Sequence, residues 1–251
     1  MIELEERGPV TILRMVRGKG NALSLEFVAA IIDALDQIER SATRAVIITG
    51  QGSTFGAGVD LPALLAGGPD YVRRFVPKMV QSFQRLATFP KPLVAAVNGH
   101  AIAGGAIIML ACDQRLLARG TARVGLSEIQ VGVQFPAWAL EIARFTTPPE
   151  HFSTLICTGR TWQPDHALTR GLVDELVEPE HLLDRALAVA EELAALAPAT
   201  FAATKREVRR PMVEAAERQS ALGDAAVLED WCSPEVQRHI SEFAAKHIKR
   251  K

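Results

Sequence analysis

The sequence predicts an α/β domain built on a largely parallel sheet. Two continuous apolar runs, at residues 45–49 and 93–97, have the length and composition of strands that are buried on both faces. Helical segments alternate with these strands, and this alternation is typical of right-handed βαβ units. The chain has 251 residues, 48% hydrophobic and 23% charged, which is enough for one large α/β domain or for a domain with a helical appendage.

The elements of the N-terminal part each have a local signal. Residues 1–16 alternate in polarity like strands, and the second of these strands lies at 10–16. Ser24 is placed to cap a helix, whose buried stripe is Val28, Ile31, Ile32, Leu35 and Ile38. After the strand at 45–49, the sequence predicts a short helix at 60–65, a break at 67–69, an amphipathic helix at 70–86, the strand at 93–97, an apolar helix from Gly104, a strand at 114–118 and a helix at 136–144.

From Thr147 onward, the sequence predicts helices without intervening strands. Pro198 and Pro211 punctuate this region. The predicted helices lie at 151–158, 164–169, 181–195, 200–208 and 234–248. Helices this apolar must cover another surface, and a neighbouring subunit is one candidate.

Two strand-to-helix turns are rich in glycine and alanine, at residues 54–61 and 98–106. Such a turn leaves backbone N–H groups bare at the positive end of a helix, and glycines remove the Cβ atoms that would keep a ligand away. One N–H group from each turn could hold a thioester oxygen as it becomes an enolate. The alternatives are ordinary βα turns and, for Gly104-Gly105, close packing between helices.

Further motifs lie at residues 91–99, 123–132 and 171–177. Taken in order with the two turns, they cover essentially the whole chain and closely resemble the enoyl-CoA hydratase/isomerase (crotonase) family. The resemblance implies a spiral of repeated ββα units. Residues 1–195 would form the core with an acyl-CoA site, and residues 196–251 a C-terminal helical region for oligomerisation. It also implies a homotrimer or dimer of trimers, an acyl-CoA thioester as partner, and no cofactor beyond the CoA of the substrate.

The resemblance assigns the oxyanion hole to the N–H groups of Val59 and Gly104. Hydratases of this family use two carboxylates, one three residues after the oxyanion-hole glycine and one in the later Gly-x-x-Glu segment. In this chain the first position is Ile107 and the second is Glu128, so one carboxylate is missing. Isoleucine cannot activate water, and an apolar pocket raises the pKa of a remaining carboxyl group.

A single carboxylate suits a proton shift that needs no water. Glu128 could remove a proton from C2 of a 3-enoyl thioester and return it at C4, which is Δ3,Δ2-enoyl-CoA isomerisation. The segment around Glu128 also resembles the isomerase branch more than the hydratase branch. The alternatives are an enoyl-CoA hydratase of low or altered activity and an acyl-CoA-binding protein without catalysis. Other crotonase-family reactions use the same oxyanion hole and stay open.

Further contacts to the acyl-CoA follow from motif position in the family. Phe135 and Trp138 would border the acyl pocket, or else anchor the following helix in the core. Lys205 is the candidate for the CoA phosphates, with Arg17 or Lys19 as helpers. The remaining substrate-binding candidates are Ala22, Ala57, Gly58, Asp60, Leu61, Gly105 and Ile107. Asp60 also suits the start of a helix, and His100 is interpreted as a packed, hydrogen-bonded side chain.

Composition argues against several other classes of function. The net charge of −1 gives no electrostatic reason to expect nucleic acid or an anionic membrane as partner. Cys112, Cys157 and Cys232 are widely spaced and have neither metal-ligand nor redox spacing, which suits a reducing cytoplasm. We expect no signal peptide, no membrane span and no metal site, and we see no Ser-His-Asp pattern or nucleotide P-loop.

Overall fold

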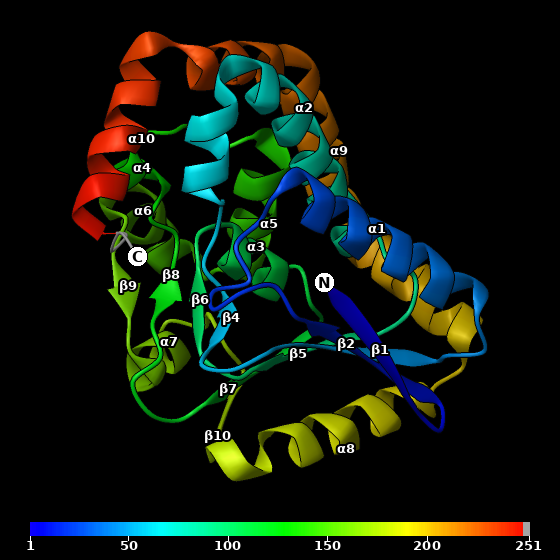
Figure 1. Ribbon diagram of the computed structural model, residues 1–251. Coiled ribbons are helices and arrows are strands. Elements are labelled where there is room, and N and C mark those ends of the chain that lie inside the picture. The colour runs from blue at the N-terminus through cyan, green and yellow to red at the C-terminus, as the bar shows by residue number, and fades with distance from the viewer. Residues whose placement is uncertain (248–251) are drawn as a thin grey trace.

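The computed structural model describes residues 1–247 and contains two β-sheets surrounded by helices (Figure 1). The larger sheet has six strands in the order β1-β2-β3-β5-β7-β10. Its strands are β1 (Ile2–Arg7), β2 (Val10–Met15), β3 (Ala45–Gly50), β5 (Leu93–Val97), β7 (Gln114–Ala118) and β10 (Glu175–Val177). Only β1 pairs antiparallel with its neighbour, and the other pairs are parallel. The prediction of a largely parallel sheet is therefore confirmed.

The second sheet has four short strands in the order β4-β6-β8-β9. They are β4 (Thr54–Gly56), β6 (His100–Ile102), β8 (Val124–Gly125) and β9 (Thr161–Trp162). The sequence prediction missed this sheet, because strands of two or three residues carry no readable periodicity. The prediction of helices alone after Thr147 is also wrong, since β9 and β10 lie in that region.

Successive chain segments contribute one strand to each sheet and then a helix. This order is β3-β4-α2, then β5-β6-α3, then β7-β8-α4, and it confirms the predicted spiral of ββα units. The helices are α1 (Leu25–Arg40), α2 (Leu61–Ala87), α3 (Gly104–Leu110), α4 (Glu128–Val131), α5 (Ala137–Thr146), α6 (Pro149–Thr158), α7 (Pro164–Thr169), α8 (Leu182–Ala194), α9 (Pro198–Cys232) and α10 (Pro234–His247), with a 3₁₀ turn at Pro179–His181.

Two helices differ from the prediction in extent. Helix α2 consists of two helical stretches joined by a kink at Gly68, which has the non-helical φ of 59° and confirms the break predicted at 67–69. Helix α9 runs on through Pro211 to Cys232, because its packing against α2 and α5 overrides the missing N–H group. The predicted end of the last helix at Ile248 lies outside the described residues.

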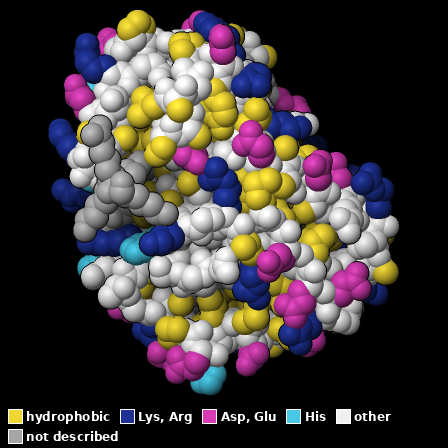
Figure 2. Space-filling model, viewed as in Figure 1, with side chains coloured by type: hydrophobic (Ala, Val, Ile, Leu, Met, Phe, Trp, Pro, Cys, Tyr) yellow, Lys and Arg dark blue, Asp and Glu magenta, His cyan; other side chains and the backbone are white. Residues whose placement is uncertain are grey.

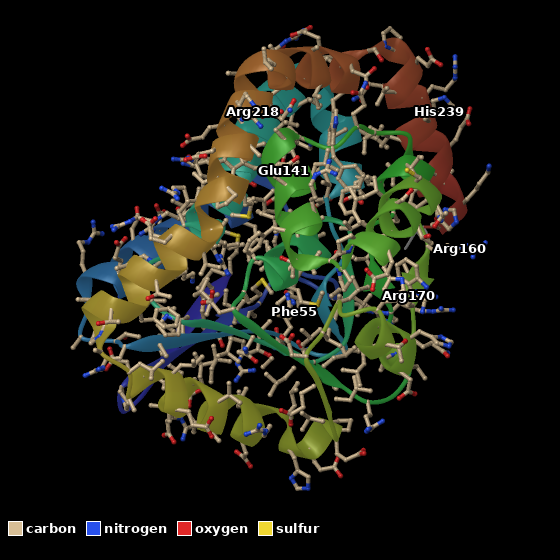
Figure 3. All side chains as sticks on the ribbon, turned by 180° about the vertical axis from the view of Figure 1, so that it is seen from behind. Phe55, Glu141, Arg160, Arg170, Arg218 and His239 are labelled. Carbon is tan, nitrogen blue, oxygen red and sulfur yellow. The ribbon has the colours of Figure 1, made fainter. Side chains whose placement is uncertain are left out.

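Helices cover both faces of the six-stranded sheet (Figure 1). Alternate residues of each strand point to opposite faces, so Ile12 and Ile47 pack with α8 while Leu13 and Ile48 belong to the larger core on the other side. Phe55 of β4 lies in this larger core, fully buried (Figure 3). Within the described residues, no single helix has the length and apolar composition to cross a membrane. Helix α8 with its 3₁₀ turn and helix α9 meet these criteria only when taken as a pair, and the pair is bent by 101° at its junction.

Helix α9 is tied to the core by buried ion pairs at Asp113, just after α3. The Lys205 Nζ and Arg209 Nη2 atoms each lie 2.6 Å from a carboxylate oxygen of Asp113. Asp113 also accepts a hydrogen bond of 2.8 Å from the N–H group of Leu93, at the start of β5. One carboxylate thus joins a strand, the end of α3 and α9.

Removal of the Asp113 carboxylate should strongly destabilise the fold. In Asp113→Ala, two almost fully buried cations lose their counter-charge, and we expect the free energy of unfolding to fall by about 3–5 kcal/mol in urea denaturation. Asp165→Ala is the matched control, because the Asp165–Arg119 pair is exposed and should contribute less than about 1 kcal/mol. Equal losses in the two variants would contradict this role for Asp113.

Candidate active site

The Val59 N–H group points away from Leu23, the residue that pairs with Val59. The Leu23 N–H group donates to the Gly58 carbonyl (2.7 Å), and the Asp60 N–H group donates to the Leu23 carbonyl (2.9 Å). These bonds form a parallel bridge between Leu23 and Val59, in which the peptide groups on either side of Val59 face Leu23. The N–H group of Val59 itself must face the opposite side, where it makes no hydrogen bond within residues 1–247.

The Gly104 N–H group lies at the first residue of α3, after a strained turn. Ala103 has φ of 52° and ψ of −127°, a conformation that non-glycine residues rarely adopt. Its N–H group donates to the Gly125 carbonyl (2.9 Å), which holds the turn against β8. As the first residue of the helix, Gly104 has no acceptor within α3 for its N–H group, and this group makes no hydrogen bond within residues 1–247.

The two turns touch backbone to backbone. A Cβ atom on Gly105 would lie 2.2 Å from the Gly56 carbonyl oxygen, and one on Gly58 would lie 2.7 Å from the Ala103 Cβ atom. Side chains at these positions would push the turns apart. Glycine is therefore required here for close approach, and this approach brings the N–H groups of Val59 and Gly104 to one pocket.

Glu128 projects into the same pocket from the first residue of α4. Its Oε2 atom is buried and has no hydrogen-bond partner in the described part of the chain. Burial without a partner charge raises the pKa of Glu128 to about 8, although the hydrogen bond to its own N–H group lowers it. Near neutral pH, the carboxyl group can therefore both accept and return a proton.

An apolar cavity, partly open to solvent, joins these groups. Val59, Gly104 and Glu128 line it together with Ala57, Leu61, Met79, Phe83, Ile102, Ala103, Ser127, Val131, Val133, Phe135, Pro136, Ala139, Trp231 and Phe243. Among these residues, Glu128 is the only one with an ionisable side chain. Hydrophobic side chains gather on this face of the molecule, over α2 and beside α10 (Figure 2).

Some residues predicted to contact the acyl chain do not line the cavity in this structure. Ile107 and Trp138 are buried in the core and are not among the residues that line the cavity, whereas Phe135 lines it. The predicted contact of Ile107 and Trp138 with the substrate stays a prediction. Gly105 contributes close packing to the turn, as described above. The apolar character of the cavity therefore comes from the residues that line it, and Ile107 is not one of them.

Lys205 has a different partner from the one predicted. Its ammonium group is buried and bound to Asp113 in this structure, and its assignment to the CoA phosphates stays a prediction. Arg17 is likewise engaged by Asp60, and the Ala22 carbonyl accepts from its guanidinium. Asp60 caps α2 by accepting from the Ala63 N–H group, in agreement with its interpretation as a helix-start residue. The packed His100 is also confirmed, because its Nδ1 atom accepts from the Arg123 N–H group.

Sequence reasoning missed the contribution of the C-terminal helices to the pocket. Trp231 and Phe243 line the cavity, so the site crosses the predicted boundary at residues 195 and 196. The Trp231 Nε1 atom donates to the Gln134 carbonyl (2.9 Å), and Asp224 accepts from the Ala137 N–H group (2.9 Å). Both bonds hold the segment that carries Phe135. No local sequence motif links α9 or α10 to the pocket, so sequence reasoning had no signal for this contribution.

Helix α10 also supports the turn that carries Glu128. Gly132 ends α4 with φ of 86°, and its N–H group donates to the Glu128 carbonyl (3.0 Å). A Cβ atom on Gly132 would lie 2.9 Å from the Cβ atom of His239, a residue of α10 (Figure 3). The short helix under Glu128 is thus packed against the last helix of the described chain.

Comparison with known proteins gives consistent matches. The profile of the family described as Enoyl-CoA hydratase/isomerase matches residues 5–248. A putative enoyl-CoA hydratase of Thermus thermophilus is 34% identical over 82% of this chain and 82% of its own length. The mitochondrial enoyl-CoA delta isomerase 1 of Homo sapiens is 28% identical over 84% of this chain and 70% of its own. The crystal structure of human mitochondrial delta3-delta2-enoyl-CoA isomerase superposes with a TM-score of 0.91 at 26% identity, covering 98% of this chain and 97% of that one.

Burial of Glu128 should cost stability in a pH-dependent way. The unfolded chain releases this proton near the ordinary pKa of 4.5, whereas the folded protein keeps it up to about pH 8. Because the folded state then binds more protons, the stability that Glu128 contributes falls as pH rises through this window. We expect Glu128→Gln to melt at a higher temperature than the wild type at pH 8, with the difference shrinking toward pH 5. Calorimetry with the exposed Glu217→Gln as control should show no such trend for the control.

The contact between the turns should not tolerate a methyl group. In Gly105→Ala the new Cβ would meet the Gly56 carbonyl, so we expect a lower melting temperature and loss of any reaction that needs both N–H donors. Gly223→Ala is the control, because nothing lies within 4 Å of its Cβ and alanine should stabilise α9 by roughly 0.5–1 kcal/mol. A fully active Gly105→Ala protein would refute the proposed geometry.

Proposed function

This chain belongs to the enoyl-CoA hydratase/isomerase family, and we propose that within it the protein is a Δ3,Δ2-enoyl-CoA isomerase with Glu128 as its proton carrier. One observation carries the proposal. The described pocket holds a single ionisable side chain, and that side chain is a buried carboxyl group beside two free backbone donors. A 1,3-proton shift needs this set of groups and nothing more.

The reaction divides into two proton transfers. Glu128 takes a proton from C2 of a 3-enoyl thioester. The C2–H electron pair then forms a C1–C2 double bond, and the carbonyl π pair moves onto the thioester oxygen, which gives a dienolate conjugated with the C3–C4 double bond. The N–H groups of Val59 and Gly104 stabilise this dienolate by hydrogen bonding. Glu128 then returns the proton to C4, the C2–C3 double bond forms, and the thioester carbonyl is restored. The step consumes no water, and we propose that it requires no cofactor.

The raised pKa of Glu128 supports both transfers. A carboxylate with a pKa near 8 is a stronger base than an ordinary glutamate, and its conjugate acid still gives up a proton readily near neutral pH. The apolar lining raises the free energy of the charged dienolate, so reprotonation by Glu128 is favoured over accumulation of the intermediate. Hydrocarbon acyl chains fit this lining, and polar substituents beyond C4 would lose hydration without gaining partners.

Hydration of a 2-enoyl thioester is the second candidate, because two curated relatives are named as hydratases. That reaction needs a water molecule held by polar groups and a second proton carrier. The position where the resemblance expects the second carboxylate is Ile107, which is fully buried in the core. Acyl-CoA binding without catalysis is the third candidate. The homotrimer or dimer of trimers stays a prediction.

A paired assay separates the three candidates. Purified protein is given trans-3-hexenoyl-CoA, followed by the rise in conjugated-thioester absorbance, and trans-2-hexenoyl-CoA, followed by the loss of that absorbance. We expect rapid conversion of the 3-enoyl substrate and negligible hydration. Faster hydration would overturn the isomerase proposal, and binding without either reaction would support the third candidate.

The pH dependence and one variant test the role of Glu128. Because the reaction starts from the carboxylate, kcat/KM should rise with pH and level off above about pH 8. Glu128→Gln keeps the size of the side chain but cannot accept the proton, so turnover should fall by at least about 10³-fold while acyl-CoA binding persists. The Glu217→Gln control should keep full turnover. Substantial turnover in Glu128→Gln would place the base elsewhere.

A further inference from the structure

Arg17 joins the two chain segments that flank the Val59 turn, although it does not line the pocket. Its Nη1 atom donates to the Ala22 carbonyl (2.7 Å), and its Nη2 atom lies 2.7 Å from the Asp60 Oδ2 atom. The side chains of Arg17 and Asp60 are 26% and 19% exposed, so the ion pair is largely shielded from solvent. A planar guanidinium can hold a carbonyl and a carboxylate at once in fixed geometry.

The same two segments are already joined by backbone hydrogen bonds. Besides the bridge between Leu23 and Val59, the Ala57 N–H group donates to the Gly20 carbonyl (2.9 Å). The buried Asn21, with φ of 48°, donates from Nδ2 to the Thr54 carbonyl (3.0 Å) and accepts from the Arg17 N–H group (2.8 Å). Arg17 thus begins a network that ends at the peptide group of Val59.

Asp60 connects Arg17 to the oxyanion hole. Its Oδ1 atom accepts from the Ala63 N–H group (3.0 Å) and caps α2, while its Oδ2 atom is held by Arg17. Asp60 directly follows Val59, so its position fixes the orientation of the Val59 peptide. Asp60 is the residue after an oxyanion donor, and an uncompensated carboxylate there would oppose negative charge on the enolate oxygen; the Arg17 cation offsets this effect.

We propose that Arg17 is a positioning residue for the oxyanion hole, and not a ligand of the CoA phosphates. It holds Asp60 and the Ala22 segment in register, and it neutralises the carboxylate that follows the oxyanion donor Val59. This inference rests on the Val59 N–H group acting as an oxyanion donor, as in the proposed function. It does not depend on which family reaction follows enolate formation.

The test uses a β-keto thioester, whose bound enolate has its own near-ultraviolet absorbance. Acetoacetyl-CoA and acetoacetyl-pantetheine, which lacks the nucleotide phosphates, are titrated with the wild type and with Arg17→Met. We expect the variant to bind both thioesters with the bound enolate reduced by roughly tenfold or more, and by the same factor for each. Turnover of trans-3-hexenoyl-CoA should fall in kcat with little change in KM.

Matched variants separate positioning from general damage. Arg85→Met removes another partly buried arginine, paired with Asp36 and Glu39 on α1, and it should lower stability without changing the enolate fraction. Arg17→Lys keeps the charge but not the two-point contact, and it should recover part of the enolate signal. It also tests the role if Arg17→Met does not fold.

Three outcomes would overturn the proposal. A loss confined to acetoacetyl-CoA would make Arg17 a phosphate ligand, an unchanged enolate fraction with both thioesters would remove any role, and an equal loss in Arg85→Met would reduce the effect to stability. The proposed function fails separately. In that case the wild type forms the enolate, and Arg17→Met lowers it, but trans-3-hexenoyl-CoA is not isomerised.

Discussion

The close approach of two backbone turns is the constraint on which the rest of the structure depends. Gly56 and Gly105 meet at a distance that leaves no room for a Cβ atom, and a Cβ atom on Gly58 would collide with Ala103. The spiral of ββα units makes this possible, because it places β4 and β6 side by side in the small sheet and starts a helix after each. Within residues 1–247, two peptide N–H groups are thereby left without partners at one point, at the cost of a strained Ala103.

Around this point the lining residues include a single ionisable side chain. The pocket is lined almost entirely by aliphatic and aromatic side chains, and Glu128 is held there with one oxygen atom unpartnered. Such a carboxyl group destabilises the folded protein, which elsewhere satisfies its buried charges, as Asp113 does with Lys205 and Arg209. The two carboxyl groups differ because they have different roles. A charge that holds helices together needs partners, whereas a proton carrier needs its partner to be the substrate.

The sequence predicted elements that have a local signature, and it failed where long-range packing decides. The cap at Ser24, the buried strands at 45–49 and 93–97 and both glycine-rich turns could be read from neighbouring residues. Glu128 could be chosen over other glutamates only through the family motif. The small sheet, the passage of α9 through Pro211 and the partner of Lys205 depend on contacts between distant segments. Periodicity and composition do not encode such contacts, so these features could not be predicted.

The place of Trp231 and Phe243 in the pocket has a consequence for biosynthesis. The ribosome releases both glycine-rich turns and Glu128 long before the segments that cover them. Until α10 emerges, a nascent chain exposes the apolar interior of its own binding site to water. Exposed apolar surface of this kind is what chaperones bind. Folding of α10 therefore both removes an aggregation-prone apolar surface and completes the wall of the acyl pocket.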